Sequence, residues 1–501
     1  MKNMKTLLYV LPAAMLALTS CTDYIDIDAE NTIDVDAIDY TDASTMHEAA
    51  TGAYATLRIQ GIHWANAMIW MGRDDDMSSG RADDQGDALK FGYPGGYTNP
   101  NAFWAVGNMW STMYNIIIDC NSNIDALDQY AENLSTGSTD YQNYLQYKGE
   151  VRVVRAWAYY QLVTNFGPCV IYRDNTQNSF RRSTVEKVYD YIITEMQEAA
   201  AGMEAKRPNQ MSRPGAFTKY TAEALAARTA LLAGNFALVE SLTDDIINGG
   251  GFELYPDYYN LFKIPGKLCN ENLMEVQCSD FGTASGDYVG VDQWFNFRGA
   301  GLTLYDEAGN WSNGIGGWTF MRYSPKFLEL MENRGETIRK ETSLLVAGTT
   351  TREGWTINGD LDRTAEIAQI YDGKGYVPFD QMTAGNSEWG RNNNVRLIRY
   401  AEVLLMNAEA KVRQGKNGDA PFNQVRARAQ MPSVNGVNID QILEERRVEL
   451  CAEWGLRYTD LCRTGQATSV LGKYGWNEGS RYIPVPSNQI INTPELGEDP
   501  E

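Results

Sequence analysis

The clearest hydrophobic pattern of the chain lies near its C-terminus, in residues 396–463. Apolar residues recur there every three or four positions, the spacing of one face of an α-helix; they are Leu397, Ala401, Leu404, Leu405, Ala408 and Val412. The same spacing predicts a solvated face made of Arg399, Glu402, Glu409 and Arg413. Gly415 predicts the end of this helix, and Asp419 with Pro421 predicts the first turn of a returning one. The two helices would form an antiparallel hairpin, the unit that stacks in helical-repeat proteins.

A third helix is predicted to begin near residue 438 and to continue toward Arg463. Its apolar stripe holds Leu443, Leu450, Cys451 and Trp454, and the spacing places Arg447 on the same stripe. A buried guanidinium needs partners, because removing one partner of a buried ion pair costs about 3–5 kcal/mol. Charged residues at suitable intervals would close an ion network: Glu444, Glu445, Glu449, Glu453, Arg457, Asp460 and Arg463. We interpret this network as structural rather than catalytic.

Similar helical patterns fill residues 41–263. Asp42 or Ser44 would cap a helix that runs to about Arg58. A longer helix is predicted within 99–130, with a buried stripe of Met109, Met113, Ile116, Ile117, Cys120 and Ile124. Two helices separated by a loop follow in 147–202, and a further helix pair, broken at Gly234-Asn235, follows in 217–254. These pairs predict a mainly α fold.

The pattern changes between residues 264 and 395. Helical periodicity fades, and Gly, Asn, Thr and aromatic residues become frequent. Five of the twelve tryptophans lie in this stretch: Trp294, Trp311, Trp318, Trp355 and Trp389. We predict short strands and long loops with one helix at 325–333, forming a lobe inserted between the helical parts 41–263 and 396–501. Loops on a rigid scaffold often carry function.

The N-terminus has the pattern of an export signal. Lys2 and Lys5 precede an apolar stretch, residues 7–18, which is too short to span a bilayer as a helix. Leu18-Thr19-Ser20 before Cys21 resembles a bacterial lipobox, so residues 1–20 would be removed and Cys21 would carry lipid. The alternative is ordinary secretion with a fortuitous cysteine. Residues 21–40 are rich in Asp and predict an acidic tether.

Composition narrows the classes of function. The formal net charge is −22, and it becomes −24 without residues 1–20, so the surface would repel nucleic-acid phosphates. Six scattered cysteines follow Cys21; Cys269 and Cys278 could form a bridge, but we expect free thiols. The chain has two histidines, His47 and His63, and no zincin, P-loop, dinucleotide or G-x-S-x-G motif. We therefore expect a binding protein rather than an enzyme, although paired carboxylates for glycoside hydrolysis stay open.

An ordered set of motifs resembles the SusD/RagB family of surface-exposed, nutrient-binding outer-membrane lipoproteins. It comprises VRLIRYAEVLLMNAEA, FNQVRARAQMP, ILEERRVEL, GLRYTDLCRTG and RYIPVPSNQIINTPEL in 396–496, with GEVRVVRAWAYY, FGP, VYDYI and LLAGNF nearer the N-terminus. The resemblance implies a scaffold of helical pairs similar to tetratricopeptide repeats. It also implies that the protein captures glycan, sits as a lid on a SusC-like TonB-dependent transporter, and is lipid-anchored at the cell surface.

Aromatic residues in two segments are the best candidates for ligand contacts. Flat rings bury the apolar face of a sugar, while carboxylates and Arg bind its hydroxyls. The resemblance implies that glycan contacts come from the loop 73–104 and from the inserted lobe. The candidates are Asp75, Arg81, Tyr97, Trp104, Trp294, Trp311 and Trp318.

Three alternatives remain open at this point. Members of the same family that bind peptides are the nearest, and a lipid-anchored glycoside hydrolase and a scaffold that binds only proteins belong to other classes. No cofactor is expected apart from a weak candidate for Ca²⁺, which takes six to eight oxygen ligands. Its ligands would be Asp74, Asp76, Asp83, Asp84 and Asp87, and the alternative is a solvated acidic loop.

Overall fold

The structure is a computed structural model of the chain. It describes residues 38–78, 87, 90–98, 103–278, 304–305, 311–312, 320–357, 359–376, 378, 381 and 393–501. Tertiary contacts separate the segment Met1–Ala43 from the unit Ser44–Glu501, and the fold below is that of the second unit.

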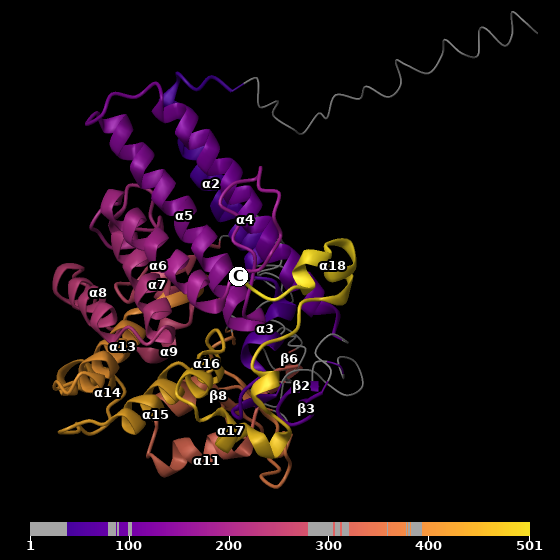
Figure 1. The fold of residues 1–501 in the computed structure, drawn as a ribbon. Helices are drawn as coiled ribbons and strands as arrows, with labels where there is room; N and C mark the ends of the chain where they lie inside the picture. Colours follow the sequence, from indigo (N-terminus) through magenta and orange to yellow (C-terminus); the bar gives the residue numbers. More distant parts are fainter. Residues whose placement is uncertain are drawn as a thin grey trace, which may run out of the picture. The chain divides into compact units, whose positions relative to one another are not determined.

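Helices form most of this unit, as the sequence periodicity predicts (Figure 1). Those before residue 263 are α2 (His47–Thr56), α3 (Trp64–Met71), α4 (Trp104–Ala131), α5 (Thr139–Phe166), α6 (Val185–Gly202), α7 (Lys219–Leu232), α8 (Phe236–Gly249) and α9 (Tyr258–Leu261). Those that follow are α11 (Pro325–Asn333), α12 (Ile338–Ser343), α13 (Tyr400–Arg413), α14 (Asp419–Arg428), α15 (Ile439–Glu449), α16 (Leu456–Arg463), α17 (Ala467–Leu471) and α18 (Ser487–Asn492). A π-helical turn, Leu57–Gly61, extends α2.

Polar side chains cap the starts of several helices by accepting a hydrogen bond from a backbone N–H of the first turn. They are Ser138 before α5, Thr184 before α6, Asn235 before α8, Ser324 before α11 and Asn438 before α15. Gly234 and Gly415, at φ +72° and +74°, follow the ends of α7 and α13, where an L-residue with a side chain would be strained. The predicted stops at both positions are confirmed.

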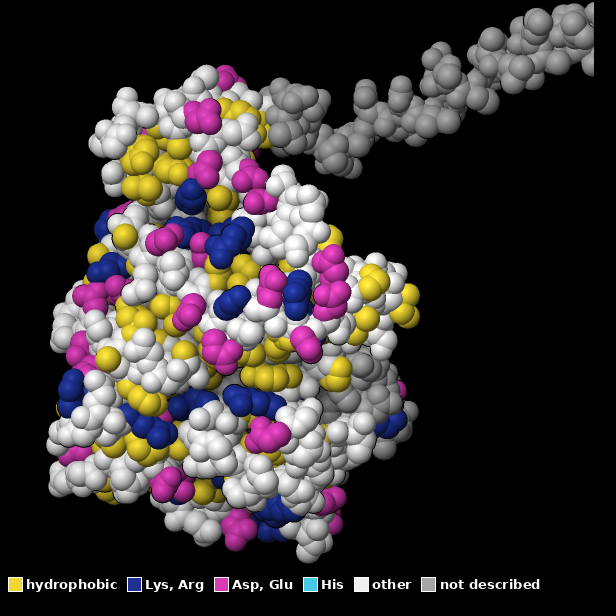
Figure 2. Space-filling view, in the orientation of Figure 1, with side chains coloured by type: hydrophobic (Ala, Val, Ile, Leu, Met, Phe, Trp, Pro, Cys, Tyr) yellow, Lys and Arg dark blue, Asp and Glu magenta, His cyan; other side chains and the backbone are white. Residues whose placement is uncertain are grey.

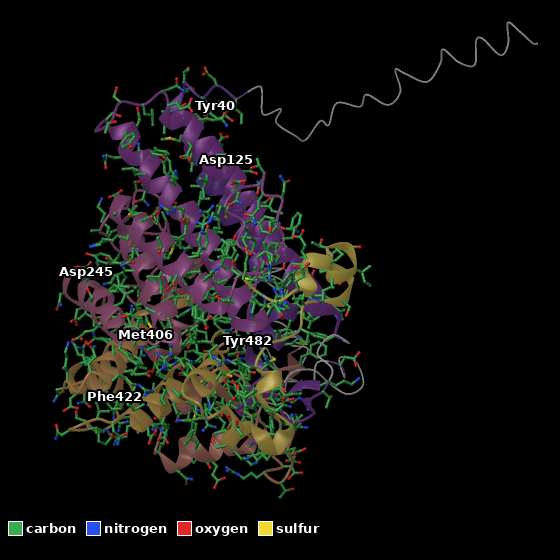
Figure 3. The ribbon with its side chains drawn as sticks, viewed as in Figure 1. Tyr40, Asp125, Asp245, Met406, Phe422 and Tyr482 are labelled. Atoms are coloured by element: carbon green, nitrogen blue, oxygen red, sulfur yellow. The ribbon has the colours of Figure 1, made fainter. Side chains whose placement is uncertain are left out.

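The helices pack in sequence order and then close on the C-terminal part. Helix α4 packs against α2 and α5, α5 against α6, α6 against α7, and α7 against α8. Helix α8 packs against α13, which contacts α14 and α15 (Figure 1). Met406 of α13 and Phe422 of α14 lie inside this stack (Figure 3). The two helical parts therefore form one scaffold, and the predicted mainly α fold is confirmed.

Short antiparallel strands make up the sheets. They are β1 (Met77–Ser78), β2 (Phe91–Gly92), β3 (Gly96–Tyr97), β4 (Asn272–Val276), β5 (Leu304–Tyr305), β6 (Trp311–Ser312), β7 (Arg322–Tyr323), β8 (Leu344–Val346), β9 (Thr356–Ile357), β10 (Ile370–Asp372) and β11 (Val395–Arg399). The strand orders are β1-β7-β10-β8, β6-β5-β9, β2-β3 and β11-β4. The predicted strands of the lobe and its helix at 325–333 are confirmed, but the lobe also contains a second helix, α12, which the sequence pattern does not predict. The six cysteines after Cys21 are free thiols, as expected.

The start of the C-terminal hairpin differs from the prediction. Leu397 lies in strand β11, which pairs with β4, and the helix begins only at Tyr400. Three of the four residues predicted to be solvated are covered: Arg399 contacts Glu271 and Glu449, Glu402 binds Arg228, and Glu409 binds Arg463. Arg413 is exposed, as predicted. Periodicity identifies the helix, but it does not reveal that other elements cover its polar side.

The third predicted helix is two helices with a sharp break. Helix α15 ends at Glu449, and α16 begins at Leu456. Between them Ala452, Trp454 and Gly455 have φ values of +56°, +54° and +68°. A Cβ on Gly455 would lie 2.1 Å from the carbonyl oxygen of Trp70, so the chain approaches α3 too closely for any other residue.

An ion network exists on this segment, as predicted, and it joins the lobe to the scaffold. Most partners of its glutamates come from other elements, however, and Arg447 pairs with Asp75 and Asp76 instead. Glu449, fully buried on α15, binds Arg399 at 3.1 Å, Arg428 at 2.5 Å and Arg339 of the lobe at 3.4 Å. Glu445 binds Arg339 at 2.6 Å, and Glu453 binds Lys374, also of the lobe, at 2.6 Å. The apolar stripe of Leu443, Leu450, Cys451 and Trp454 is buried as predicted.

Candidate functional site

Five aromatic side chains gather where α3 and α4 begin. We call them the aromatic cluster: His63, Trp64, Phe103, Trp104 and Phe320. The ring centroids of Trp64 and Trp104 lie 5.7 Å apart at 64°, and His63 lies 5.6 Å from Trp64 and 6.0 Å from Trp104. Phe103 lies 5.7 Å from Trp104, and Phe320 stacks on Trp64 at 6.3 Å. These separations are typical of interacting rings.

Helix starts fix two sides of the cluster. His63 is the N-cap of α3, and its Nδ1 accepts a hydrogen bond from the backbone N–H of Ala65 at 3.2 Å. Phe103 is the N-cap of α4 in extended conformation, so Trp104 is the first helical residue. Both tryptophans therefore lie at the first turn of a helix: Trp104 is exposed and Trp64 is half-buried.

A strand pairing brings Phe320 to the cluster from far along the chain. Strand β1, soon after α3, pairs with β7, so that Met77 lies opposite Tyr323. Ser324 donates its backbone N–H to the carbonyl oxygen of Asp76 at 2.8 Å. Phe320, two residues before β7, is thereby held beside Trp64.

The cluster offers an accessible, flat apolar surface. The side chain of Trp104 is 50% exposed, one of four large hydrophobic side chains that are exposed among the described residues, whereas Phe320 and Phe103 behind it are buried. Burial lowers the pKa of His63 below its ordinary value, which favours the neutral imidazole. Such a surface can stack against a ligand with flat, weakly polar faces.

Asp75 and Asp76, two of the acidic residues that follow α3, bind arginines of the C-terminal helices α15 and α16. Arg447 binds Asp75 at 3.1 Å and makes a bidentate contact with Asp76, and Arg457 binds Asp75 at 3.2 Å. Burial raises the pKa of Asp74 well above its usual value, and the charges of Asp76 and Asp75 raise it further. Burial also acts on Asp75, but Arg447 and Arg457 lower its pKa below the usual value.

This arrangement bears on the Ca²⁺ candidates. The carboxylates of Asp74, Asp75 and Asp76 bring one oxygen each within 4.8 Å of one another, as a cation site would require. A cation bound there would have to displace Arg447 and Arg457. Asp87 is on the surface and pairs with Lys90 at 2.6 Å. Asp83 and Asp84 lie outside the described residues, so the Ca²⁺ hypothesis stays a prediction.

Tyr97, another predicted ligand contact, has a different environment. Its hydroxyl donates to the carbonyl oxygen of Arg73 at 2.5 Å, and its ring packs on a cluster around Tyr458, Leu461 and Trp476. Arg73 itself is buried and donates to the Tyr458 hydroxyl at 2.8 Å. Both side chains thus anchor the loop that leads into α4.

The structure does not describe the side chains of the remaining candidates for ligand contacts. Arg81, Trp294 and Trp318 are outside the described residues, as is Cys21. Trp311 is in strand β6, whose backbone alone is described. Of the predicted contacts, Trp104 is therefore the one placed in the aromatic cluster. Sequence reasoning did not select His63, Trp64 or Phe320; the apolar run Trp64–Met71 directly after His63 was the available signal for a helix start.

Comparison with known families decides the classification. The model of the SusD family matches residues 240–495, about half of the chain. The chain belongs to the SusD family. The N-terminal part of this SusD-family protein, residues 28–231, matches a second family model, described as starch-binding and associating with the outer membrane.

Individual relatives are similar to this SusD-family protein in sequence or fold over most of its length. It is 24% identical over 486 residues to a SusD-like protein of Bacteroides ovatus, covering 91% of this chain and 82% of the relative. It is 24% identical to the starch-binding protein SusD of Bacteroides thetaiotaomicron, covering 72% of this chain and 74% of that one. Its fold is similar to surface glycan-binding protein A of Bacteroides thetaiotaomicron, solved with laminarihexaose, with a TM-score of 0.70 at 22% identity, covering 90% of this chain and 98% of that one.

Among the described residues, no helix is long and apolar enough to cross a membrane.

Proposed function

We propose that this protein binds oligosaccharides at the bacterial cell surface and that the aromatic cluster provides part of the binding site. The observation that carries the proposal is the half-exposed Trp104, packed edge-to-face on Trp64. A sugar ring presents C–H groups on one face, which stack on such a ring, and hydroxyls at its edge.

The relatives support a glycan as the ligand class. One similar protein is described as starch-binding, and one similar structure contains laminarihexaose. The acidic composition also suits a neutral ligand better than a polyanion. On the face in Figure 2, acidic and basic side chains are interspersed, without one large basic patch that would attract a polyanionic ligand.

We further propose that the protein holds its ligand for transport rather than cleaving it. The chain has only two histidines; His63 caps α3, and His47, an exposed residue at the start of α2, contacts the carbonyl oxygen of Ser44. Lipid on Cys21 and the tether 21–40 would keep the body close to the outer membrane. A SusC-like TonB-dependent transporter would then be the receiver, as membership of the family suggests.

Incubation with a panel of glycans tests the ligand and the reaction together. The protein is mixed with laminarihexaose, malto- and xyloglucan oligosaccharides, and a peptide mixture, and both retention and products are measured. Retention of a glycan without new products is the expected result. Release of shorter sugars would mean a glycoside hydrolase, and retention of peptides alone would favour the peptide-binding alternative.

Extraction of native membranes tests the partner. Mild detergent and affinity purification should recover an outer-membrane barrel protein in stable stoichiometry with this chain. If the chain is recovered consistently alone, at low salt and with glycan present, the transport role fails while glycan binding stands.

A further inference from the structure

A large cavity lies in the lobe, and its walls share no residue with the aromatic cluster. Its volume is about 960 Å³, within the usual size of small-molecule sites. Its walls come from the turn before α9, from α11 and α12, and from β8 with the hairpin that follows it. Within the described residues, strand β8 is an edge strand of the four-stranded sheet.

The floor of the cavity is aliphatic. It is formed by Leu328 of α11, Leu344 and Leu345 of β8, and Ala347 and Ile357 of the hairpin, all buried. Ile338, Val346 and Leu361 complete the wall and are half-buried. A floor of branched carbon chains favours a ligand with aliphatic groups, because burying apolar surface on both sides removes it from water.

The tyrosines of the wall are already engaged, which argues against a sugar here. Tyr258 donates its hydroxyl to the carbonyl oxygen of Glu449 at 2.9 Å, and Arg428 lies 4.6 Å from its ring. Tyr259 donates to Glu353, and its ring contacts Lys263 at 4.7 Å and Arg352 at 5.0 Å. Their ring faces are therefore occupied by cations rather than available for stacking.

Most charges at the rim are paired with one another. Arg352 binds Asp257 through two hydrogen bonds of 2.9 and 3.0 Å, and Arg363 binds Glu332 through two of 2.8 Å. These four side chains are more than one-third exposed, so the pairs add little stability and can open.

Lys340 differs from Arg352 and Arg363 because it has no carboxylate partner among the described residues. Lys340 of α12 is half-buried and lines the cavity, yet its ammonium forms no ion pair or hydrogen bond within the part of the chain that the structure describes. Lys340 has a weak electrostatic interaction with Glu332. The pKa of Glu332 is lowered mainly by its hydrogen bond with Arg363 and to a smaller extent by the charge of Lys340. Glu341, the neighbouring residue, is exposed at the rim.

We infer that this cavity is a second binding site, for an aliphatic carboxylate whose carbon chain lies on the leucine floor and whose carboxylate pairs with Lys340. An ammonium is a strong partner for a carboxylate when both are partly desolvated. Two sources offer this chemistry: a fatty acid, or the C-terminus of a short peptide with aliphatic side chains. The proposal is independent of glycan binding, because the two sites share no side chain.

Titration calorimetry on the full chain with two probes tests the site. The probes are decanoate below its micelle concentration and the tripeptide Gly-Val-Leu, with decanol and the amidated tripeptide as forms that lack the carboxylate. Saturable 1:1 binding of at least one carboxylate probe is expected, at least tenfold tighter than its uncharged form. The tighter probe identifies the source.

Three variants make the result specific. Lys340→Met keeps the aliphatic stem and removes the charge, and it should weaken binding at least tenfold. Val346→Trp should place a bulky ring at the aliphatic wall and weaken binding at least tenfold. Lys187→Met, on the exposed surface of α6, is the matched control and should bind like the wild type. Retained glycan binding and an unchanged thermal midpoint show that each variant is folded.

Two results would overturn the proposal. One is the lack of saturable binding by either carboxylate probe. The other is binding that is equal for the charged and uncharged forms, or unchanged by Lys340→Met in a folded protein.

Discussion

Glu223 of α7 and Asp245 of α8 share one lysine at the surface of the scaffold. The ammonium of Lys219 lies 2.5 Å from Asp245 and 3.5 Å from Glu223. Asp245 lies on α8 at the edge of the scaffold (Figure 3), whereas Glu223 is only 6% exposed and its Oε2 has no hydrogen-bond partner. Burial, followed by contact with Asp245, raises the pKa of Glu223 to about 8, and Lys219 lowers that of Asp245.

Stability should therefore fall with rising pH at this site. Between the ordinary pKa of a glutamate and about 8, the folded chain binds a proton at Glu223 that the unfolded chain has lost. The contribution of Glu223 to the free energy of unfolding is full at low pH and is lost as the pH rises through about 8. Glu223→Gln, which stays neutral, should be more stable than the wild type at pH 8.5, by roughly 3 kcal/mol, with little difference near pH 5.

Urea denaturation of both proteins across this pH range measures the difference. Glu186→Gln, on the exposed face of α6, is the control. Parallel pH profiles for wild type and Glu223→Gln would show that Glu223 is ionised in the folded protein.

At the scale of elements, the ion network on α15 explains how the lobe is held. Arg339 and Lys374 of the lobe both reach carboxylates of the segment Glu445–Glu453. Arg399 of β11 and Arg428 of α14 reach the same segment from the scaffold. Glu449 lies at the centre and is fully buried, and it is shared by Arg339, Arg399 and Arg428, each of which also binds a second carboxylate.

Removing the carboxylate of Glu449 should be far more harmful than removing an exposed neighbour. Glu449→Ala should lower the free energy of unfolding by about 3–5 kcal/mol, because it removes one carboxylate from a buried network and leaves the guanidinium groups around it with one uncompensated positive charge. Glu444→Ala, which loses one exposed contact with Arg334, should cost at most about 1 kcal/mol. Chemical denaturation of both variants compares them, and equal losses would contradict the central position of Glu449.

The same elements show what a sequence can and cannot predict. The helix pairs were predictable because their apolar residues recur at helical spacing and their ends carry Gly, Asn or Pro. The break between α15 and α16 was not, because Ala452 and Trp454 adopt positive φ, which neither residue prefers. Likewise, Arg399 and Glu402 look solvated in the sequence, and only the packing of β4 and α7 around them shows otherwise.

At the scale of the whole molecule, the aromatic cluster unites segments that are far apart in the sequence. Trp104 was predictable as an aromatic residue at the end of a loop rich in Gly and acids. Phe320 was not, because it reaches Trp64 only through the pairing of β1 with β7, and no local pattern fixes that pairing. Asp75 and Tyr97 have the right chemistry for a ligand contact, but they are used inside the scaffold.

We propose that the N-terminal segment attaches the protein to the outer membrane. If Cys21 carries lipid, Cys21→Ala should convert a membrane-bound protein into a soluble one, since the acyl chains supply the binding energy. Fractionation of cells that express each form, with external protease on intact cells, measures location and exposure. A Cys21→Ala protein that still sediments with the outer membrane would contradict the lipid anchor.

The central claim is that glycan binds at the aromatic cluster, and calorimetry of Trp104→Ala tests it most directly. The titrant is the glycan that the wild type retains most strongly, beginning with laminarihexaose, and the control is Ile118→Ala. Ile118 lies on the same helix and is 42% exposed, but it is outside the cluster. Loss of a ring that dominates a binding site typically costs 2 kcal/mol or more, so Trp104→Ala should weaken affinity about thirtyfold while Ile118→Ala changes it little. A folded Trp104→Ala protein that binds as tightly as the wild type would contradict the account.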